Sequence, residues 1–336
     1  MRVTERLATF TRQLLPGARP RAVVLVYHRV GERRLDPWRL TVEPEIFGGQ
    51  MEALARNWFP LSLAELVEGF ARRHLPERAV AVTFDDGYAD NLEIAAPILV
   101  EHGIPATLFV ATDLVDAGRP PWWDQLASLL LEPSRLPPML TLSCGGDRWR
   151  IPPLAADERR PSPDAPQPWN AEPGTRLRAF YEVWLALRAL DAPTREAALD
   201  EIAEWAGALP SFRRVLLTWE QVREFAALPG FALGAHTLTH PALPTCSSQD
   251  ARAEIAGGAD RLRAQTGVEV EQFAYPFGAW TRSVARLVAD LGFRGAYTTD
   301  GSAISWSSSP HALPRVPAEN RAPGDFASVL ADLSGR

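Results

Sequence analysis

The sequence predicts an α/β protein built on a mainly parallel sheet or barrel. Apolar stretches of strand length alternate with amphipathic stretches of helix length on both sides of residues 113–216. Polar residues gather at the ends of these apolar stretches, as on the catalytic face of parallel barrels. A hydrophobic content of 46% and a charged content of 23% are typical of a globular chain with an apolar core.

The first third of the chain supplies the opening strands and helices. The stretch 21–30 is apolar and mostly β-branched before it turns polar, which is typical of a buried strand. Ser62 and Glu65 have the spacing of a capping box, so we expect a helix to begin at residue 63. The expected strands are 21–30, 79–85 and 106–111, and the expected helices are a stretch around Phe47, Met51 and Leu54, then 63–74 and 88–102.

Residues 113–216 interrupt the alternation, so we expect an insertion carried by a barrel made of 1–112 and 217–336. In the insertion we expect helices at 122–131, 176–189 and 194–207, a hairpin at 140–151 that turns at Gly145, Gly146 and Asp147, and a flexible Pro-rich loop at 152–175. The alternation resumes after a second capping box, Thr218 with Gln221, with strands beginning at 231, 270 and 294 and helices at 250–265, 282–291 and 324–333.

Charge and cysteine content exclude several classes of protein. A net charge of −6 argues against a nucleic-acid partner. The two cysteines, Cys144 and Cys246, form no zinc-ribbon or disulfide pattern. No stretch approaches the roughly 20 apolar residues of a membrane span. Charges at the N-terminus interrupt any signal-peptide core, so the sequence predicts a cytoplasmic protein.

The N-terminal segment is amphipathic. Val3, Leu7, Phe10 and Leu14 recur at helical spacing, with arginines on the other side. Such a helix usually covers the core of its own domain. The alternative is a peripheral contact of residues 3–14 with the inner face of a membrane.

Two adjacent carboxylates, Asp85 and Asp86, follow the apolar strand 79–85 and precede Gly87. Burying two like charges side by side is costly unless a cation compensates one of them. Gly87 allows a turn that brings both carboxylates to one cavity. One carboxylate can then bind a metal ion while the other acts as a general base; the alternative is a turn pair that faces water.

A histidine pair follows another expected strand. His236 and His240 are spaced i, i+4, and Pro241 argues that they lie in a loop instead of a helix. Two imidazoles and one carboxylate form a ligand set suited to Zn²⁺ or another divalent first-row ion. The same set also serves non-haem iron oxygenases, but the parallel strand pattern argues against that class.

Three motifs resemble those of the NodB-homology polysaccharide deacetylases, carbohydrate esterase family four. They are TFDDG at 83–87, HTLTH at 236–240 and FAYPFG at 273–278, in the order that the family has them. The resemblance covers roughly residues 1–112 and 217–317. It implies an irregular (β/α)7 barrel, with the mainly helical insertion mounted on it.

The resemblance also implies a role for each matching residue. Asp86, His236 and His240 match the family's metal ligands, most often of Zn²⁺, with Co²⁺ or Mn²⁺ as substitutes. Asp85 matches the catalytic base, and the backbone N–H of Phe277 matches the donor to the oxyanion.

Three departures from the family pattern stand out. Ala274 stands where many members have the arginine that orients the base, and Arg315 is a candidate replacement. The late Leu-x-His motif that carries the general acid is absent, and His311, the only late histidine, is a candidate for that acid. The insertion at 113–216, with its WWDQL segment, is similar to a subgroup associated with exopolysaccharide or glycolipid synthesis.

The resemblance implies a hydrolase that removes N-acetyl groups from amino-sugar glycans or lipid-linked sugars. Deformylation, O-acetyl ester or cyclic-amide hydrolysis, and an inactive carbohydrate-binding homologue are the alternatives. Flat rings pack on sugar faces, and His28 lies at a strand end near the expected site. The candidate substrate-binding residues are Tyr275, Trp280, Trp122, Trp123 and His28.

Overall fold

The structure is a computed structural model that describes residues 20–33, 35–137, 139–144, 147–151, 161–162, 165–208 and 214–335. Several sequence predictions fall outside the described residues: the helix at 3–14, the turn residues Gly145 and Gly146, and residues 152–160, 163 and 164 of the loop expected at 152–175. No described helix is long and apolar enough to cross a membrane.

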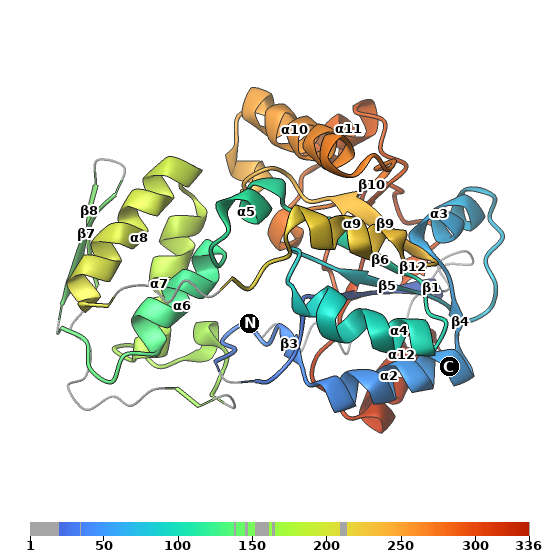
Figure 1. The fold of residues 1–336 in the computed structure, drawn as a ribbon, viewed down its shortest axis with the longest axis horizontal. Helices are drawn as coiled ribbons and strands as arrows, with labels where there is room; N and C mark the ends of the chain where they lie inside the picture. The colour runs from blue at the N-terminus through green and yellow to red at the C-terminus, as the bar shows by residue number, and fades with distance from the viewer. Residues whose placement is uncertain are drawn as a thin grey trace.

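One twisted sheet forms the centre of the molecule, in the strand order β11-β10-β9-β6-β5-β1-β12 (Figure 1). All its strand pairs are parallel except β1 with β12. The strands of this sheet are β1 (Pro20–Tyr27), β4 (Phe59–Pro60), β5 (Ala79–Phe84), β6 (Ala106–Val110), β9 (Phe231–Ala235), β10 (Gln272–Ala274), β11 (Gly295–Tyr297), β12 (Ile304–Ser305) and β13 (Val316–Pro317).

The segment 313–317 closes the sheet into a barrel. Leu313 forms a parallel bridge with Tyr297 at the end of β11, and Val316 in β13 pairs with Leu25 in β1. The segment therefore acts as the seventh parallel strand beside β1, β5, β6, β9, β10 and β11. The α/β barrel prediction is confirmed, and the closure places Arg315 inside the barrel, where it is fully buried.

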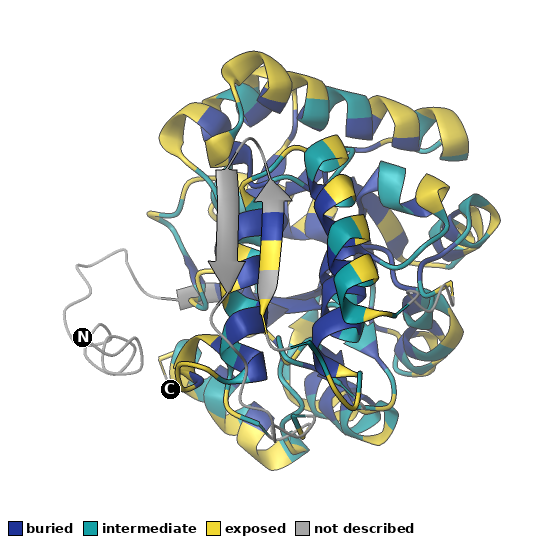
Figure 2. Cartoon of the chain, turned by 90° about the vertical axis from the view of Figure 1, so that its left-hand side faces the viewer, coloured by how far each residue is buried: buried dark blue, intermediate teal, exposed yellow. Residues whose placement is uncertain are grey.

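Side chains alternate between the two faces of each strand. In β5, Ala81 belongs to the small cluster of the barrel interior, whereas Val80 and Val82 belong to the larger core beneath the helices. Small residues such as Ala81 face inward because the interior of a small barrel has little room. Figure 2 shows buried residues concentrated in the sheet and on the inner faces of the helices.

The helices surround the sheet (Figure 1). Helices α2 and α12 pack against each other, as do α10 and α11. Ser62 and Thr218 form the two predicted capping boxes, at the starts of α3 and α9. The helices around the sheet, including α5 at the start of residues 113–216, are α2 (Pro44–Asn57), α3 (Leu63–Ala71), α4 (Ala96–Glu101), α5 (Thr112–Ala117), α9 (Trp219–Ala227), α10 (Ser248–Thr266), α11 (Arg282–Asp290) and α12 (Pro323–Leu333).

Residues 113–216, which we call the insertion as proposed from the sequence, carry a hydrophobic core of their own. That core includes Trp122, Phe180 and Ile202, and Phe277 of the barrel packs against it. Figure 1 shows these elements grouped beside the barrel. They are α6 (Trp122–Leu131), β7 (Leu140–Cys144), β8 (Asp147–Ile151), α7 (Arg176–Arg188) and α8 (Ala192–Ala206).

Two expected elements differ from prediction near the site. The first strand ends at Tyr27, and β2 (Arg29–Val30) pairs instead with β3 (Thr41–Val42), so His28 lies at a break between strands. The helix expected at 88–102 begins as a π-helical turn, η2 (Asn91–Ala95), before α4. Asn91 is buried there and donates to the carbonyl of His28 at 2.8 Å, which ties the helix start to the strand break.

Candidate metal centre and active site

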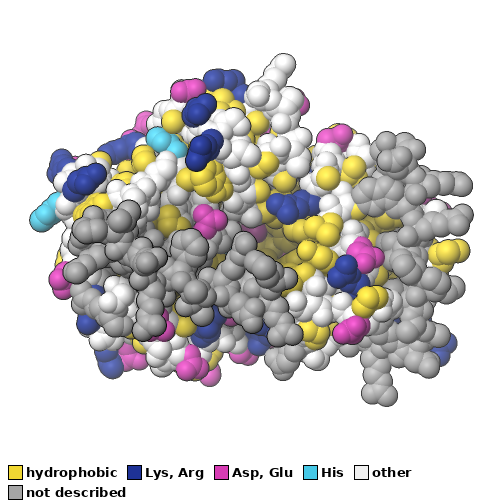
Figure 3. All heavy atoms as spheres, turned by 180° about the vertical axis from the view of Figure 1, so that it is seen from behind, with side chains coloured by type: hydrophobic (Ala, Val, Ile, Leu, Met, Phe, Trp, Pro, Cys, Tyr) yellow, Lys and Arg dark blue, Asp and Glu magenta, His cyan; other side chains and the backbone are white. Residues whose placement is uncertain are grey.

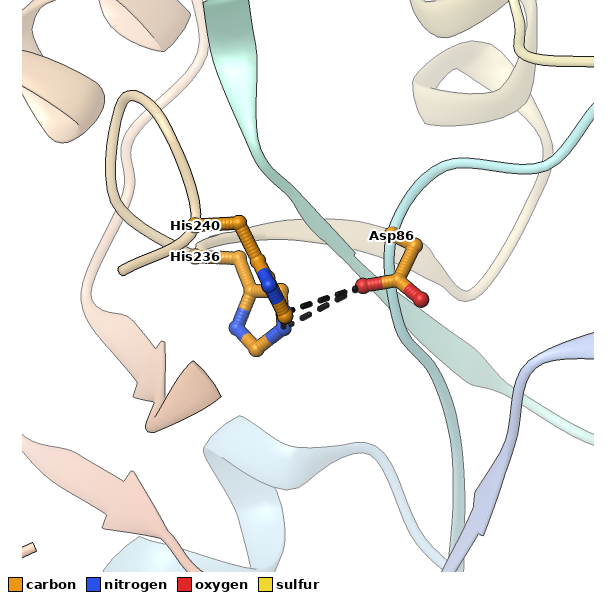
Figure 4. A group of neighbouring side chains, drawn as sticks. All are labelled: Asp86, His236 and His240. Atoms are coloured by element: carbon orange, nitrogen blue, oxygen red, sulfur yellow. Dashed lines mark hydrogen bonds and ion pairs between the residues drawn. The ribbon is translucent and has the colours of Figure 1, made fainter. Parts of the chain in front are cut away.

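The three candidate metal ligands face one another at the carboxyl ends of β5 and β9 (Figure 4). Asp86 Oδ1 lies 3.5 Å from His236 Nε2 and 3.3 Å from His240 Nε2. The two Nε2 atoms are 3.1 Å apart, and all three side chains are buried. Residues from distant parts of the sequence therefore converge on one point.

These spacings fit a single divalent ion. Donor atoms that bind one Zn²⁺-type ion at about 2.0–2.2 Å lie roughly 3.0–3.5 Å from one another. Asp86 Oδ1 is buried and makes no hydrogen bond with any described residue. Two imidazole nitrogens that face each other can share only one proton between them. The donor set and its unsatisfied oxygen thus suit a cation.

The surroundings of the two imidazoles set their protonation states differently. His236 Nδ1 lies 2.8 Å from the carbonyl of Ala274, which fixes the proton on Nδ1 and leaves Nε2 free to bind a metal. Burial lowers the pKa of His236, but the charges of Asp85 and Asp86 outweigh it and raise the pKa above its ordinary value. Burial and the nearby His236 hold the pKa of His240 well below its ordinary value, so this ring is neutral.

The loop that carries the histidines is held by three contacts. Thr237, at a φ of 70°, accepts from the His240 N–H at 3.0 Å through its hydroxyl. Glu254 on α10 accepts from the N–H groups of Leu238 and Thr239 at 3.0 and 2.9 Å. Gly258 allows α10 to approach, because a Cβ there would lie 2.5 Å from the Thr237 carbonyl carbon.

Asp85 is bound by an arginine inside the barrel. It follows Thr83 and Ala81 in the inward-facing register of β5, so its side chain enters the barrel. Arg315 donates to both of its carboxylate oxygens, at 2.7 and 2.6 Å, and also to Thr83 Oγ1 at 3.1 Å. Burial raises the pKa of Asp85, but the Arg315 charge outweighs it and holds the pKa below its ordinary value. Asp85 is therefore ionised near neutral pH.

Phe277 presents both a backbone donor and a ring to the site. Its φ of 58° is unusual for a bulky residue, and its N–H donates to no described group. Gly278 follows with a φ of 64°, and a Cβ there would lie 2.0 Å from Thr299 Oγ1. The Phe277 ring centre lies 4.5 Å from that of His240.

A cavity of about 420 Å³ opens over these groups. Asp85, Asp86, His236 and His240 line one part of it, and an aromatic wall lines another part. Figure 3 shows the rear face of the molecule hollowed between hydrophobic side chains, with arginines beside the hollow. The residues that complete the aromatic wall are Trp38, Trp123, Trp169, Trp184 and Phe277.

Comparison with known proteins identifies the family. A family model described as polysaccharide deacetylase matches residues 72–135 and 187–296, which together exceed half of the chain. The chain belongs to the polysaccharide deacetylase family. YxkH of Bacillus subtilis (strain 168), which carries a polysaccharide deacetylase name, is 50% identical over 34 residues. That match spans 10% of this chain and 12% of YxkH.

Solved structures of deacetylases share the fold. The deacetylase PplD of Streptococcus pyogenes, solved in complex with acetate, has a TM-score of 0.60 and 18% identity, with 93% of this chain and 99% of PplD covered. IcaB of Ammonifex degensii has a TM-score of 0.54 and 19% identity, covering 93% of this chain and 97% of IcaB. At identities below 20%, these TM-scores show a shared fold and nothing further, so the substrate must be argued from the site.

Two of the candidate substrate-binding residues line the cavity, namely His28 and Trp123. Trp123 packs 4.6 Å from the His240 ring, and its indole N–H donates to Tyr88 Oη at 2.9 Å. Tyr88 in turn donates to Asp124 at 3.1 Å. Burial raises the pKa of Asp124 to about 6, although Arg29 opposes this. This chain of contacts fixes the Trp123 ring against the metal group.

The other candidate residues lie away from the cavity lining. Trp122 is buried behind Trp123, and the buried Tyr275 donates to the His311 carbonyl at 2.7 Å, with Trp280 packed beside it. The His311 ring nitrogen Nε2 lies 2.8 Å from the Phe293 carbonyl.

The sequence interpretation missed most of the aromatic wall. Trp38, Trp169 and Trp184 come from separate segments and share no motif with the metal ligands. One signal was available, since six of the eleven tryptophans fall within residues 113–216. Such a density in one segment favours a surface with a specific ligand or partner.

Proposed function

We propose that this protein is a metal-dependent hydrolase that removes N-acetyl groups from amino-sugar-containing glycans or glycolipid intermediates. The observation that carries the proposal is the pairing of two chemically distinct carboxylates in one cavity. Asp86 faces two imidazoles, whereas Asp85 faces an arginine. Membership of the polysaccharide deacetylase family supports the same conclusion.

Asp86, His236 and His240 would hold the metal, with Zn²⁺ the best match to two imidazoles and a carboxylate. The bound ion supplies Lewis acidity, which polarises a carbonyl and makes water more acidic. His236 and His240 offer Nε2 atoms to it, and Asp86 offers Oδ1.

Asp85 acts as the general base in this proposal. Its low pKa keeps it ionised, and Arg315 fixes both of its oxygens. Asp85 removes a proton from the water that attacks the acetamide carbonyl carbon. The Phe277 N–H, which lacks a described acceptor, donates to the carbonyl oxygen as negative charge develops there.

The leaving nitrogen needs a proton when the C–N bond breaks. We assign this step to His28, which lines the same cavity as Asp85. His311 is a weaker candidate, because its ring nitrogen is engaged by the Phe293 carbonyl. The products are acetate and the free amino sugar.

The test is acetate release from N-acetylglucosamine oligosaccharides with added Zn²⁺, Co²⁺ or Mn²⁺. Wild-type protein should release acetate, and Asp85→Asn should retain the metal while losing at least about a thousandfold in kcat. Formylated sugars, acetylated xylan and a cyclic amide serve as competing substrates. Preferential turnover of one of these would replace the N-acetyl assignment, and metal binding without any turnover would indicate a carbohydrate-binding homologue.

The place of action is also a proposal. The amphipathic pattern of residues 3–14 supports an enzyme that meets lipid-linked or nucleotide-linked sugars at the inner membrane face. Cell fractionation should recover the protein with membranes, and high salt should release part of it. Recovery from the culture medium alone would contradict this location.

A further inference from the structure

Arg188 lies in the wall of the cavity without a carboxylate partner. It is the last residue of α7, and it makes no ion pair within the described part of the chain. Its Nε is buried and bonds to no described group. Burial lowers the pKa of Arg188, although Tyr181 opposes this, and the group stays charged at neutral pH. A half-buried cation of this kind requires either water or a ligand anion.

Two aromatic rings hold the guanidinium in place. Its carbon Cζ lies 5.2 Å from the Trp184 ring centre and 4.7 Å from the Phe277 ring centre. Aromatic rings contact the flat face of a guanidinium through cation–π and stacking interactions. The N–H groups at its edge stay free to donate hydrogen bonds. Those N–H groups form the fork that recognises two oxygens of a carboxylate or phosphate.

The charges that line the cavity leave it positive. Asp85 is neutralised by Arg315, and Glu319 pairs with Arg321 at 2.9 Å. Asp86 faces the imidazoles and is assigned to the metal. Two cations then remain without an ion pair among the described residues, Arg188 and the exposed Arg39. The cavity is thus locally positive, whereas the whole chain carries a net charge of −6.

We propose that Arg188, assisted by Arg39, binds a carboxylate or phosphate group of the substrate, so that the natural substrate is an acidic acetamido glycan. This inference rests on the proposed function, because it names the class of glycan that the same site receives. The Phe277 ring touches both Arg188 and His240, so one aromatic side chain separates the anion site from the metal group. The acidic group would then belong to the acetamido sugar itself or to the next sugar residue.

Ligand binding to the Zn²⁺-loaded protein tests the inference without requiring turnover. The probes are N-acetylglucosamine, N-acetylmuramic acid for a carboxylate and N-acetylglucosamine 1-phosphate for a phosphate, measured by calorimetry. Wild-type protein should bind at least one acidic probe about tenfold or more tightly than the neutral sugar. The probe with the larger gain identifies the acidic group.

Arg188→Gln should remove at least about tenfold of the affinity for the preferred acidic probe and much less for the neutral sugar. Arg188→Lys keeps the charge but loses the fork, so it should retain part of the preference. The control is Arg178→Gln on the same helix, because Arg178 pairs with Glu182 on the surface at 2.8 Å. Arg178→Gln should bind all three probes as the wild type does.

Equal affinity of the wild type for acidic and neutral probes would overturn the inference, as would an unchanged acidic preference in folded Arg188→Gln. The metal itself attracts anions, so only a preference that depends on Arg188 counts in support. Acetate release from neutral oligosaccharides together with equal binding of the three probes would remove this inference and leave the proposed function intact. A binding preference that depends on Arg188, without any deacetylation of the probes or oligosaccharides, would support the anion site and contradict the proposed deacetylase function.

Discussion

Two neighbouring aspartates have different surroundings because the backbone turns between them. Asp85 continues the inward register of β5 and meets Arg315 inside the barrel. Asp86 has a φ of 73°, which leaves the extended conformation and directs its carboxylate towards the imidazoles. A left-handed conformation in a non-glycine residue costs about 1–3 kcal/mol, so the surrounding contacts must maintain it.

Arg315→Met tests the electrostatic role of the arginine. Without the guanidinium, burial raises the pKa of Asp85, so the base becomes protonated at higher pH than in the wild type. The acidic limb of the kcat/KM profile should therefore move to higher pH, and activity near neutral pH should fall by about a hundredfold. A pH–rate profile measures both effects.

Arg315→Lys is the matched variant, since it keeps the charge and loses the bidentate contact. Its acidic limb should lie between those of the wild type and Arg315→Met. Removing one partner of a buried pair can cost about 3–5 kcal/mol, so circular dichroism must establish that each variant is folded. If the acidic limb of the kcat/KM profile is unchanged in folded Arg315→Met, Arg315 does not position or charge-stabilise the base.

At the scale of elements, the metal site depends on how closely α10 approaches the histidine loop. Gly258 faces the backbone of Thr237, and Glu254 one turn earlier accepts from two loop N–H groups. Thr237 and His240 both have positive φ, at 70° and 57°. The helix therefore supports a loop that would otherwise relax from this conformation.

Gly258→Ala should weaken the site without touching a ligand. The added Cβ meets backbone atoms at 2.5 and 2.6 Å, so the helix or the loop must move. We expect a loss of about 1–3 kcal/mol in stability and at least a tenfold weaker affinity for Zn²⁺. Denaturant unfolding and a competitive chelator titration measure these effects.

Gly48→Ala is the control for helix propensity. Gly48 lies in α2, and a Cβ there would meet nothing within 4 Å. This variant should gain roughly 0.5–1 kcal/mol of stability and bind Zn²⁺ as the wild type does. Equal Zn²⁺ affinity in both variants would mean that the approach of α10 does not shape the site.

Sequence patterns predicted the parts of the site that follow strands. Asp85, Asp86 and His236 come directly after apolar runs, and parallel strands bring such ends to one face. Arg315 was predicted as a candidate, but its buried position follows from the closure of the barrel by 313–317, which is a long-range pairing. The site roles of these residues stay predictions until the variants are measured.

The aromatic wall could not be predicted in the same way. Trp169 and Trp184 reach the cavity because the insertion packs its core against Phe277. That packing joins segments with no shared period or motif. The break at His28 in the expected first strand likewise depends on the pairing of β2 with β3, whose residues show little strand pattern of their own.

At the scale of the whole molecule, the metal links segments that are distant in the sequence. Asp86 and His236 are separated by the entire insertion, and the unfolded chain cannot offer their donor atoms together. Binding of the ion should therefore favour the folded state. The insertion also contacts the histidine loop directly, because Arg195 on α8 donates to the Thr239 carbonyl at 3.4 Å.

Zn²⁺ should accordingly raise the melting temperature. A free concentration of 100 times Kd stabilises the folded state by about 2.7 kcal/mol, which corresponds to a rise of about 4 °C for a protein of this size. Differential scanning calorimetry of wild-type protein and of Asp86→Asn measures the effect. The variant should show little rise, and an equal rise in both proteins would place the ion elsewhere.

The most direct test of the central claim is a crystal structure of the Zn²⁺-soaked protein with anomalous data at the zinc edge. We expect one strong peak about 2.0–2.2 Å from Asp86 Oδ1, His236 Nε2 and His240 Nε2, with Asp85 held by Arg315 beside it. If no peak lies between these three atoms, or if the zinc lies on other residues, the proposed metal centre is wrong.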